Sequence, residues 1–404
     1  MSRILLCWEM GSNTGHVRHL SWLGQAFEAR GHQVQYCLKT PEAGAHILPE
    51  RAVVTAAPLP DFPPPSQPPP RWNYTSLLRL RGFHEPTILQ PQVTRWVAAM
   101  ESAEPDFVVT DHAPTAVLAA RCLGLPHATL GIGFLVPPLT FPMPLCHWWP
   151  GPGPSRAQLR QEDRAVAASA STLLAEYGQP EVECVADLLR APVRALTTVP
   201  ALDDYTERPA DEAYFGTWGA ESAAAGAVSP DWPAGEGPRV LGYLRTRYRP
   251  FPALIHALHT QPVRALIHVP DCTPEQAEQW SSDRIRLIRE PLNLSTLAPS
   301  CDFALGYGGG GFSADLLKLG KPMLLAPAVL QQEMVSRRVV KVGAGLLAGP
   351  QADYQQIAGL LHRLSTESTF AERADDLAHH IAQWPMGRAM ENQIVDACET
   401  YLCQ

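Results

Sequence analysis

The sequence predicts an α/β protein made of two Rossmann-like domains, each with its own parallel sheet. The chain has 404 residues, 46% of them hydrophobic, which is more than one hydrophobic core ordinarily holds. In each half of the chain, short apolar runs alternate with amphipathic segments. Glycine-bearing turns separate an apolar run from the amphipathic segment that follows it, as in βαβ units.

The first half opens with a strand, a glycine-bearing turn and a helix. Residues 4–8 form the apolar run and residues 11–15 the turn. Apolar residues then recur at helical spacing from Leu20 to Phe27, and Gly31 is placed to end that helix. Further strands are predicted at residues 34–38, 107–110 and 127–131, and a helix at residues 116–123.

The second half repeats the rhythm after a change in composition. Residues 203–237 are rich in Ala, Gly, Glu and Pro and poor in branched apolar residues, which is typical of a linker. We therefore predict an N-terminal domain at residues 1–203, a linker at 204–237 and a C-terminal domain at 238–387. Strands are predicted at residues 240–244, 265–269, 285–288, 303–305 and 323–326, with a helix at 251–258 and amphipathic helices after Gly349.

Composition argues against several function classes. The net charge is −8 with no basic run, which disfavours a nucleic-acid partner. No apolar stretch is long enough to span a membrane, and the N-terminus lacks the features of a signal peptide. The nine cysteines form no CxxC pair and several lie in apolar strands, which suits free thiols and a cytoplasmic location. No zinc-type spacing of His and Cys is present, so we expect no metal site.

Four consecutive glycines form the strongest local signal. Gly308, Gly309, Gly310 and Gly311 lie between a predicted strand and a predicted helix. Without Cβ atoms, their amides can close around an anion, and the helix directs its free N–H groups to the same place. A tight turn is the structural alternative, but four glycines exceed what a turn needs. The segment matches neither a P-loop, which ends in Gly-Lys-Ser/Thr, nor a dinucleotide fingerprint.

The stretch from Arg289 to Gly345 resembles the donor-binding signature of UDP-glycosyltransferases and bacterial macrolide-type glycosyltransferases. That signature runs His-Gly-Gly-x-Gly-Thr/Ser, then Glu, Gly-x-Pro and a proline-led turn with Asp-Gln. Its counterparts here, at the same spacing, are Tyr307 to Phe312, Asp315, Gly320-Lys321-Pro322, Pro327 and Gln331-Gln332. The resemblance implies the GT-B fold, in which two Rossmann-like domains face each other across a cleft. It also implies that the last residues, about 388–404, pack back on the N-terminal domain.

The resemblance assigns donor-binding roles, and several residues depart from the pattern. Tyr307 stands in place of a phosphate-contacting His, Phe312 in place of the Thr/Ser hydroxyl, and Asp315 in place of a ribose-binding Glu. Gln331 replaces the Asp that contacts the donor sugar, and Gln332 keeps its place beside it. Three more donor-binding candidates, in the loop after the first strand of the C-terminal domain and at the start of the signature, are Arg245, Thr246 and Arg289. The arginines can supply charge-assisted bonds that Tyr307 cannot.

Two residues of the N-terminal half carry the expected chemistry. A His at a strand-to-helix turn lies at the carboxyl edge of the sheet, where α/β proteins bind ligands. The resemblance identifies His16 as the catalytic base and Asp111 as the carboxylate that orients it. An acceptor hydroxyl is a poor nucleophile and needs such a base. The structural alternatives are a packed or helix-capping His16 and an Asp111 that caps the next helix.

These residues imply a metal-independent, inverting transfer of a hexose-type sugar from a UDP- or dTDP-linked donor to a small, partly apolar acceptor. Phe134, Trp148 and Trp149 are the predicted acceptor-binding residues, because a Pro- and Gly-rich loop with aromatic residues suits an apolar ligand. A monomer or homodimer is expected. Two alternatives remain open: an epimerase-like enzyme, and a non-catalytic nucleotide-sugar-binding protein, which the altered donor residues favour.

Overall fold

The structure is a computed structural model that describes residues 1–11, 14–59, 71–146, 153–205, 208–210, 212–218 and 227–402. These residues divide into two compact units. Unit 1 comprises Met1–Thr198, Tyr205–Phe215 and the C-terminal residues from Arg388. Unit 2 comprises Val199–Asp204 and Gly216–Gly387.

Unit 1 is built on a six-stranded parallel sheet in the order β3-β2-β1-β4-β5-β6. Its strands are β1 (Arg3–Trp8), β2 (Gln33–Leu38), β3 (Val53–Ala56), β4 (Phe107–Asp111), β5 (His127–Gly131) and β6 (Val193–Leu196). Every residue of β4 and of β5 is buried, because helices cover both faces of a parallel sheet and favour continuous apolar runs.

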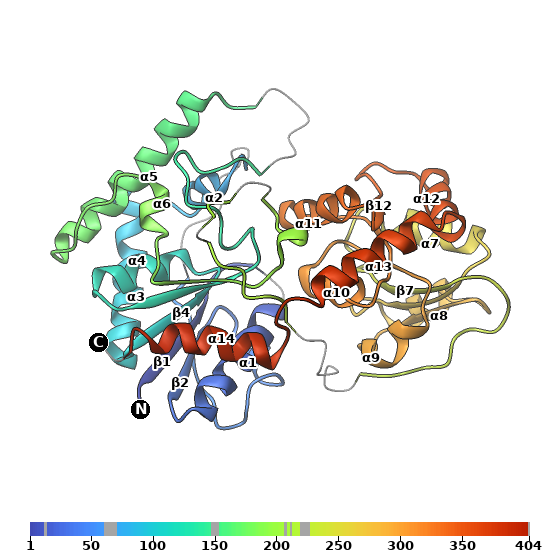
Figure 1. Cartoon of the computed structure of the whole chain (residues 1–404), viewed down its shortest axis with the longest axis horizontal. Coiled ribbons are helices and arrows are strands. Elements are labelled where there is room, and N and C mark those ends of the chain that lie inside the picture. Colours follow the sequence, from blue (N-terminus) through green and yellow to red (C-terminus); the bar gives the residue numbers. More distant parts are fainter. Residues whose placement is uncertain are drawn as a thin grey trace. The chain divides into compact units, whose positions relative to one another are not determined.

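The helices of unit 1 include one from the far end of the chain. They are α1 (Gly15–Ala29), α2 (Tyr74–Leu80), α3 (Pro86–Ala103), α4 (Pro114–Cys122), α5 (Arg156–Glu176), α6 (Val185–Leu188) and α14 (Arg388–Glu399). α1 ends where Gly31 takes a positive φ of 84°, as its position predicted. α14, red in Figure 1, packs against α1, and Arg30 bonds Asp396 and Glu399 across that contact.

Unit 2 repeats the same sheet topology. Its six parallel strands follow the order β12-β11-β10-β7-β8-β9. They are β7 (Arg239–Tyr243), β8 (Arg264–His268), β9 (Ile285–Ile288), β10 (Phe303–Gly306), β11 (Met323–Leu325) and β12 (Gly345–Leu347). The helices are α7 (Phe251–Thr260), α8 (Pro274–Trp280), α9 (Leu294–Leu297), α10 (Gly310–Leu317), α11 (Leu330–Lys341), α12 (Tyr354–Thr366) and α13 (Thr369–Ile381).

Each sheet reverses its strand order beside its first strand. In unit 1 the reversal lies between β1 and β4, and in unit 2 between β7 and β10. Ligands of doubly wound sheets bind outside the carboxyl ends of the strands at this point. The ends of these four strands are therefore the places to look for a site.

Two further sequence predictions can be compared with the structure. The eight cysteines in the described part of the chain are free thiols, and seven of them are buried. Within the same residues, no helix is long and apolar enough to cross a membrane.

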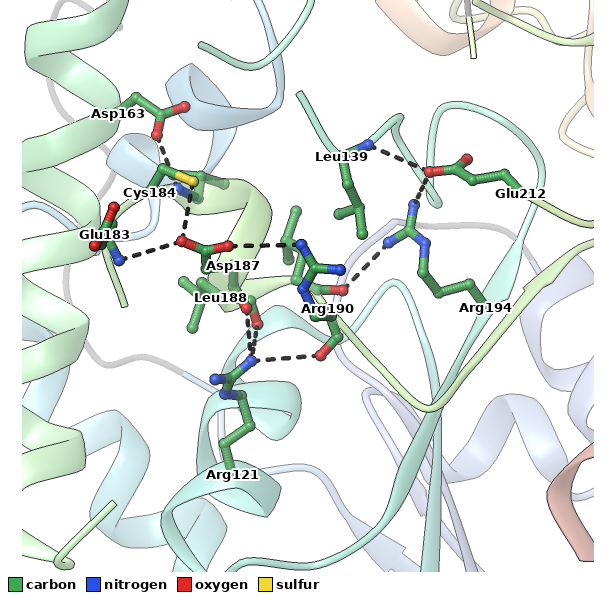
Figure 2. A network of polar contacts seen from close by, with 12 residues as sticks. Arg121, Leu139, Asp163, Glu183, Cys184, Asp187, Leu188, Arg190, Arg194 and Glu212 are labelled. Carbon is green, nitrogen blue, oxygen red and sulfur yellow. Dashed lines mark hydrogen bonds and ion pairs between the residues drawn. The ribbon is translucent and has the colours of Figure 1, made fainter. Parts of the chain in front are cut away.

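A buried carboxylate holds several helices of unit 1 together. Asp163 on α5 is fully buried and accepts hydrogen bonds from the Val185 amide (2.8 Å), the Met143 amide (3.2 Å) and the Thr75 hydroxyl (3.2 Å). Figure 2 shows it beside the polar contacts of α6. In the same view, Glu212 joins Arg194 of β6 to the Leu139 amide in the loop after β5. The sequence alone did not identify either carboxylate as an anchor.

We expect Asp163→Asn to lower the free energy of unfolding by about 1–3 kcal/mol, because the amide turns an N–H group toward donors that need an acceptor. Asp187→Asn is a matched control in the same network, since that side chain is 36% exposed. Thermal and urea denaturation would measure both variants. Equal effects of the two substitutions would contradict the anchoring role.

Candidate functional site

His16 and Asp111 meet at the reversal point of the first sheet. His16 is the second residue of α1, and Asp111 is the last residue of β4. The Nδ1 atom of His16 lies 2.9 Å from Oδ1 of Asp111. The side chains are 15% and 1% exposed. Because a carboxylate only accepts, Nδ1 carries the proton and Nε2 is left as the basic nitrogen.

The electrostatics favour an ionised Asp111. Burial alone would raise the pKa of Asp111, but His16, with smaller contributions from His19 and His112, outweighs burial and lowers the pKa below its ordinary value. A carboxylate held in this state stabilises positive charge on the ring that it contacts. The pair can therefore accept a proton at Nε2.

Two residues that the sequence did not single out lie against the His16 ring. The Trp8 indole stacks on it, with ring centroids 5.4 Å apart and planes at 20°. Gly11 has a φ of +89°, and a Cβ atom added there would lie 2.6 Å from Nε2 of His16. Gly11 therefore leaves the basic nitrogen uncovered.

The neighbouring wall of the site is aromatic. His112 adopts a positive φ of 49°, and its ring lies 6.1 Å from those of His16 and Phe134. Burial, with the nearby His16, lowers the pKa of His112 to about 3, so this ring is neutral at physiological pH. Phe134 is only 5% exposed and packs edge-on against His112. Trp148 and Trp149, the other predicted acceptor residues, lie outside the described residues.

A second buried carboxylate lies at the same sheet edge. Glu9, just after β1, accepts from the Thr115 amide (3.0 Å) and hydroxyl (2.8 Å) and lies 3.6 Å from Arg81. It thus caps the N-terminus of α4. The position of Glu9 directly after a predicted strand was the available sequence signal.

Lys39, just after β2, supports the turn before His16. Its ammonium group donates to the Gly11 carbonyl at 2.6 Å.

The glycine cradle, residues Gly308 to Gly311, lies at the reversal point of the second sheet. It connects β10 to α10, whose N-cap is Gly309. Gly308 has a φ of +76°, and an added Cβ would lie 2.3 Å from Ser336 Oγ and 2.6 Å from the Gln332 carbonyl oxygen. Gly309 and Gly311 have no atom within 4 Å of the equivalent position. Gly308 is thus required by packing, while Gly309 and Gly311 face open space at a helix N-terminus.

The side chains that flank the cradle form an aromatic cluster. Tyr307 is only 6% exposed and belongs to the core of unit 2. Its ring lies 5.1 Å from Tyr243 and 4.8 Å from Tyr248, and Phe312 lies 5.9 Å from Tyr243. Burial and Tyr243 raise the pKa of Tyr307 well above its ordinary value. Arg245 donates to the Tyr243 hydroxyl at 2.8 Å, so its cation lies beside this cluster.

The other predicted donor residues have protein partners. The Thr246 amide bonds Asp271 (3.1 Å), and Arg289 Nε bonds the Cys272 carbonyl (2.9 Å). Asp315 pairs with Lys318 at 3.1 Å. Gln332 is buried, and its side chain accepts from the Ala328 amide, whereas Gln331 is half-buried. Among the residues described, no group of three or more His, Cys, Asp and Glu side chains could hold a metal ion.

Comparisons with known proteins match this architecture. No family model matches the chain, and no curated protein does. Among solved structures, the glycosyltransferase VinC in complex with DTDP superposes with a TM-score of 0.70 and 18% identity, over 98% of this chain and 100% of that one. The forosaminyltransferase SpnP gives 0.68 and 18% over 100% of both chains. The rhamnosyltransferase SpnG with spinosyn aglycone gives 0.67 and 18%, over 99% and 100%.

The chain has the GT-B fold. The fold predicted from the sequence is therefore confirmed, as is the resemblance to natural-product glycosyltransferases at the level of structure. In this GT-B chain, the predicted catalytic base His16 and its carboxylate partner Asp111 lie in unit 1, and the predicted phosphate cradle lies in unit 2. Each lies at the reversal point of its own sheet.

We expect Gly308→Ala to lower the free energy of unfolding by about 1–3 kcal/mol, because its Cβ meets main chain and its φ is strained. Gly309→Ala, which meets open space at an ordinary φ of −64°, should stay within about 0.5 kcal/mol of the parent protein. Differential scanning calorimetry of both variants would measure this. A stable Gly308→Ala protein would show that the cradle can relax around a side chain.

Proposed function

We propose that the protein is a glycosyltransferase that moves a hexose-type sugar from a nucleoside diphosphate donor to a hydroxyl of a small, partly apolar acceptor. The observation that carries this proposal is the His16–Asp111 pair, a base with an orienting carboxylate at the reversal point of a GT-B sheet. Such a pair can activate a hydroxyl nucleophile.

The names of the similar structures suggest the substrate classes. VinC was solved with DTDP and SpnG with spinosyn aglycone. We infer a dTDP- or UDP-linked donor and a small-molecule acceptor for this chain. The buried Phe134 ring and the half-buried His112 ring support an apolar part of that acceptor near the base.

In the proposed reaction, Nε2 of His16 takes the proton of the acceptor hydroxyl as the oxygen attacks the anomeric carbon. Asp111 stabilises the imidazolium through the 2.9 Å contact at Nδ1. The bond from the anomeric carbon to the diphosphate oxygen breaks on the opposite side. One direct displacement of this kind inverts the anomeric configuration.

Unit 2 would bind the donor and stabilise the leaving diphosphate. The open faces of Gly309 and Gly311, with the free N–H groups that begin α10, suit an anion. Arg245, held by the Tyr243 hydroxyl, places a cation beside the aromatic cluster that flanks the cradle. We propose that main-chain amides and Arg245 replace the missing imidazole and hydroxyl.

His16→Ala should reduce turnover by a factor of roughly 10² to 10⁴, because it removes a positioned base. Binding of dTDP should be unchanged, since His16 lies in unit 1 and the cradle in unit 2. Product formation by chromatography and titration calorimetry would measure the two effects. Near-normal turnover in this variant would reject His16 as the base.

Gly309→Val should abolish dTDP binding while the chain stays folded, because the branched side chain fills the open space in front of the α10 amides. Titration calorimetry with dTDP and with UDP would test this. Gly359→Val, at an exposed glycine of α12 with an ordinary φ and no neighbour within 4 Å, controls for general effects of glycine substitution in unit 2. Unchanged affinity would mean that the cradle is only structural. If the parent protein binds nucleotide but transfers no sugar, the non-catalytic alternative holds.

A further inference from the structure

We propose that Trp8 is a positioning residue for His16, whose indole face fixes the plane of the imidazole. The proposal depends on the proposed function only in treating His16 as the base. It concerns a contact inside unit 1, between the end of β1 and the start of α1.

The sheet register places Trp8 beside Asp111. The two residues are direct partners in the parallel pairing of β1 with β4. Side chains of paired residues in neighbouring strands point to the same face of a sheet. His16 lies on that face and contacts both: its Nδ1 bonds Asp111, and its ring stacks on the indole.

The Trp8 ring is itself held in place. It is only 2% exposed, and its Nε1–H donates to the Met10 carbonyl. The Met10 amide in turn donates to the His112 carbonyl at 3.0 Å. The indole is therefore a fixed surface against which the imidazole packs.

Three contacts together determine the orientation of the His16 ring. Asp111 holds Nδ1, Trp8 stacks on one ring face, and Gly11 lies beside Nε2, where a Cβ atom would collide with that nitrogen. A rotation of the ring about its Nδ1 contact would move Nε2 away from the gap that Gly11 leaves. Trp8 is the contact that opposes this rotation.

The test is the tautomer of His16 in the ligand-free full-length chain, followed by NMR of ¹⁵N-labelled histidine at alkaline pH, where an imidazole is neutral. The Asp111 contact keeps the proton on Nδ1 in the parent protein. In Trp8→Leu the ring can rotate away from Asp111, so the ¹⁵N signals should show a mixture of the two tautomers, and Trp8→Phe should show less mixing. Trp96→Leu is the matched control, because Trp96 is also fully buried in unit 1 but lies on α3. An unchanged tautomer in Trp8→Leu would overturn the proposal.

A second measurement decides the question if Trp8→Leu does not fold. In the parent protein, the ring current of Trp8 should shift the His16 ring protons upfield, and Trp8→Phe should reduce that shift. Ring protons at ordinary positions would reject the stacked geometry.

Kinetics add a readout that separates this proposal from the proposed function. Trp8→Leu should lower kcat roughly tenfold through misorientation of the base, with the KM values for donor and acceptor little changed. If no transfer occurs in any variant but the mixture of tautomers is seen in Trp8→Leu, the proposed function fails and the positioning role of Trp8 stands.

Discussion

The hydrogen bond between His16 and Asp111 is the contact around which the first unit is arranged. A buried carboxylate is costly unless a partner compensates its charge, and Asp111, at the end of a fully buried strand, has His16 as its hydrogen-bonded partner. The same bond fixes the tautomer of the imidazole and leaves Nε2 basic. The turn before α1, with Gly11 against Nε2 and Lys39 on its carbonyl, keeps that nitrogen accessible. One interaction thus compensates a buried charge and determines which nitrogen of the imidazole carries the proton.

The second unit has the same topology, but main chain rather than side chains faces the open space at its reversal point. Its strand order and its glycine turn follow the pattern of the first unit, but the residues expected to contact a donor through side chains are largely committed elsewhere. Tyr307 lies in the core, Asp315 pairs with Lys318, and the Gln332 side chain accepts a hydrogen bond from the Ala328 amide. What faces open space is main chain at Gly309 and Gly311. Recognition of a diphosphate by amides tolerates such exchange of side chains, because the amides are present whatever the residue.

The sequence was informative where a pattern is local and limited where a contact joins distant segments. The alternation of apolar runs and helical faces predicted the strands that matter for the site, and the turns placed His16 and the glycine cradle at strand ends. Helix α3 escaped detection because Pro91 interrupts its pattern, and α5 because it is rich in alanine and polar residues. Trp8 was classed with an apolar strand, since its role depends on the register between β1 and β4. The burial of Tyr307 depends in the same way on Tyr243 and Tyr248, which lie on another strand and loop.

Two buried carboxylates at one sheet edge show how the surroundings separate structural from chemical roles. Glu9 directly follows β1 and Asp111 ends the neighbouring β4, and both are almost fully buried. Burial raises the pKa of Glu9 in spite of Arg81 and Thr115, whereas His16 lowers the pKa of Asp111 in spite of burial. Titratable groups whose surroundings move their pKa values apart are suited to different tasks. Glu9 accepts hydrogen bonds from Thr115 at the N-terminus of α4, and a carboxyl group can accept such bonds even when it is neutral. Asp111 keeps its charge beside His16, a ring that can gain or lose a proton, and this difference separates the roles open to the two carboxylates.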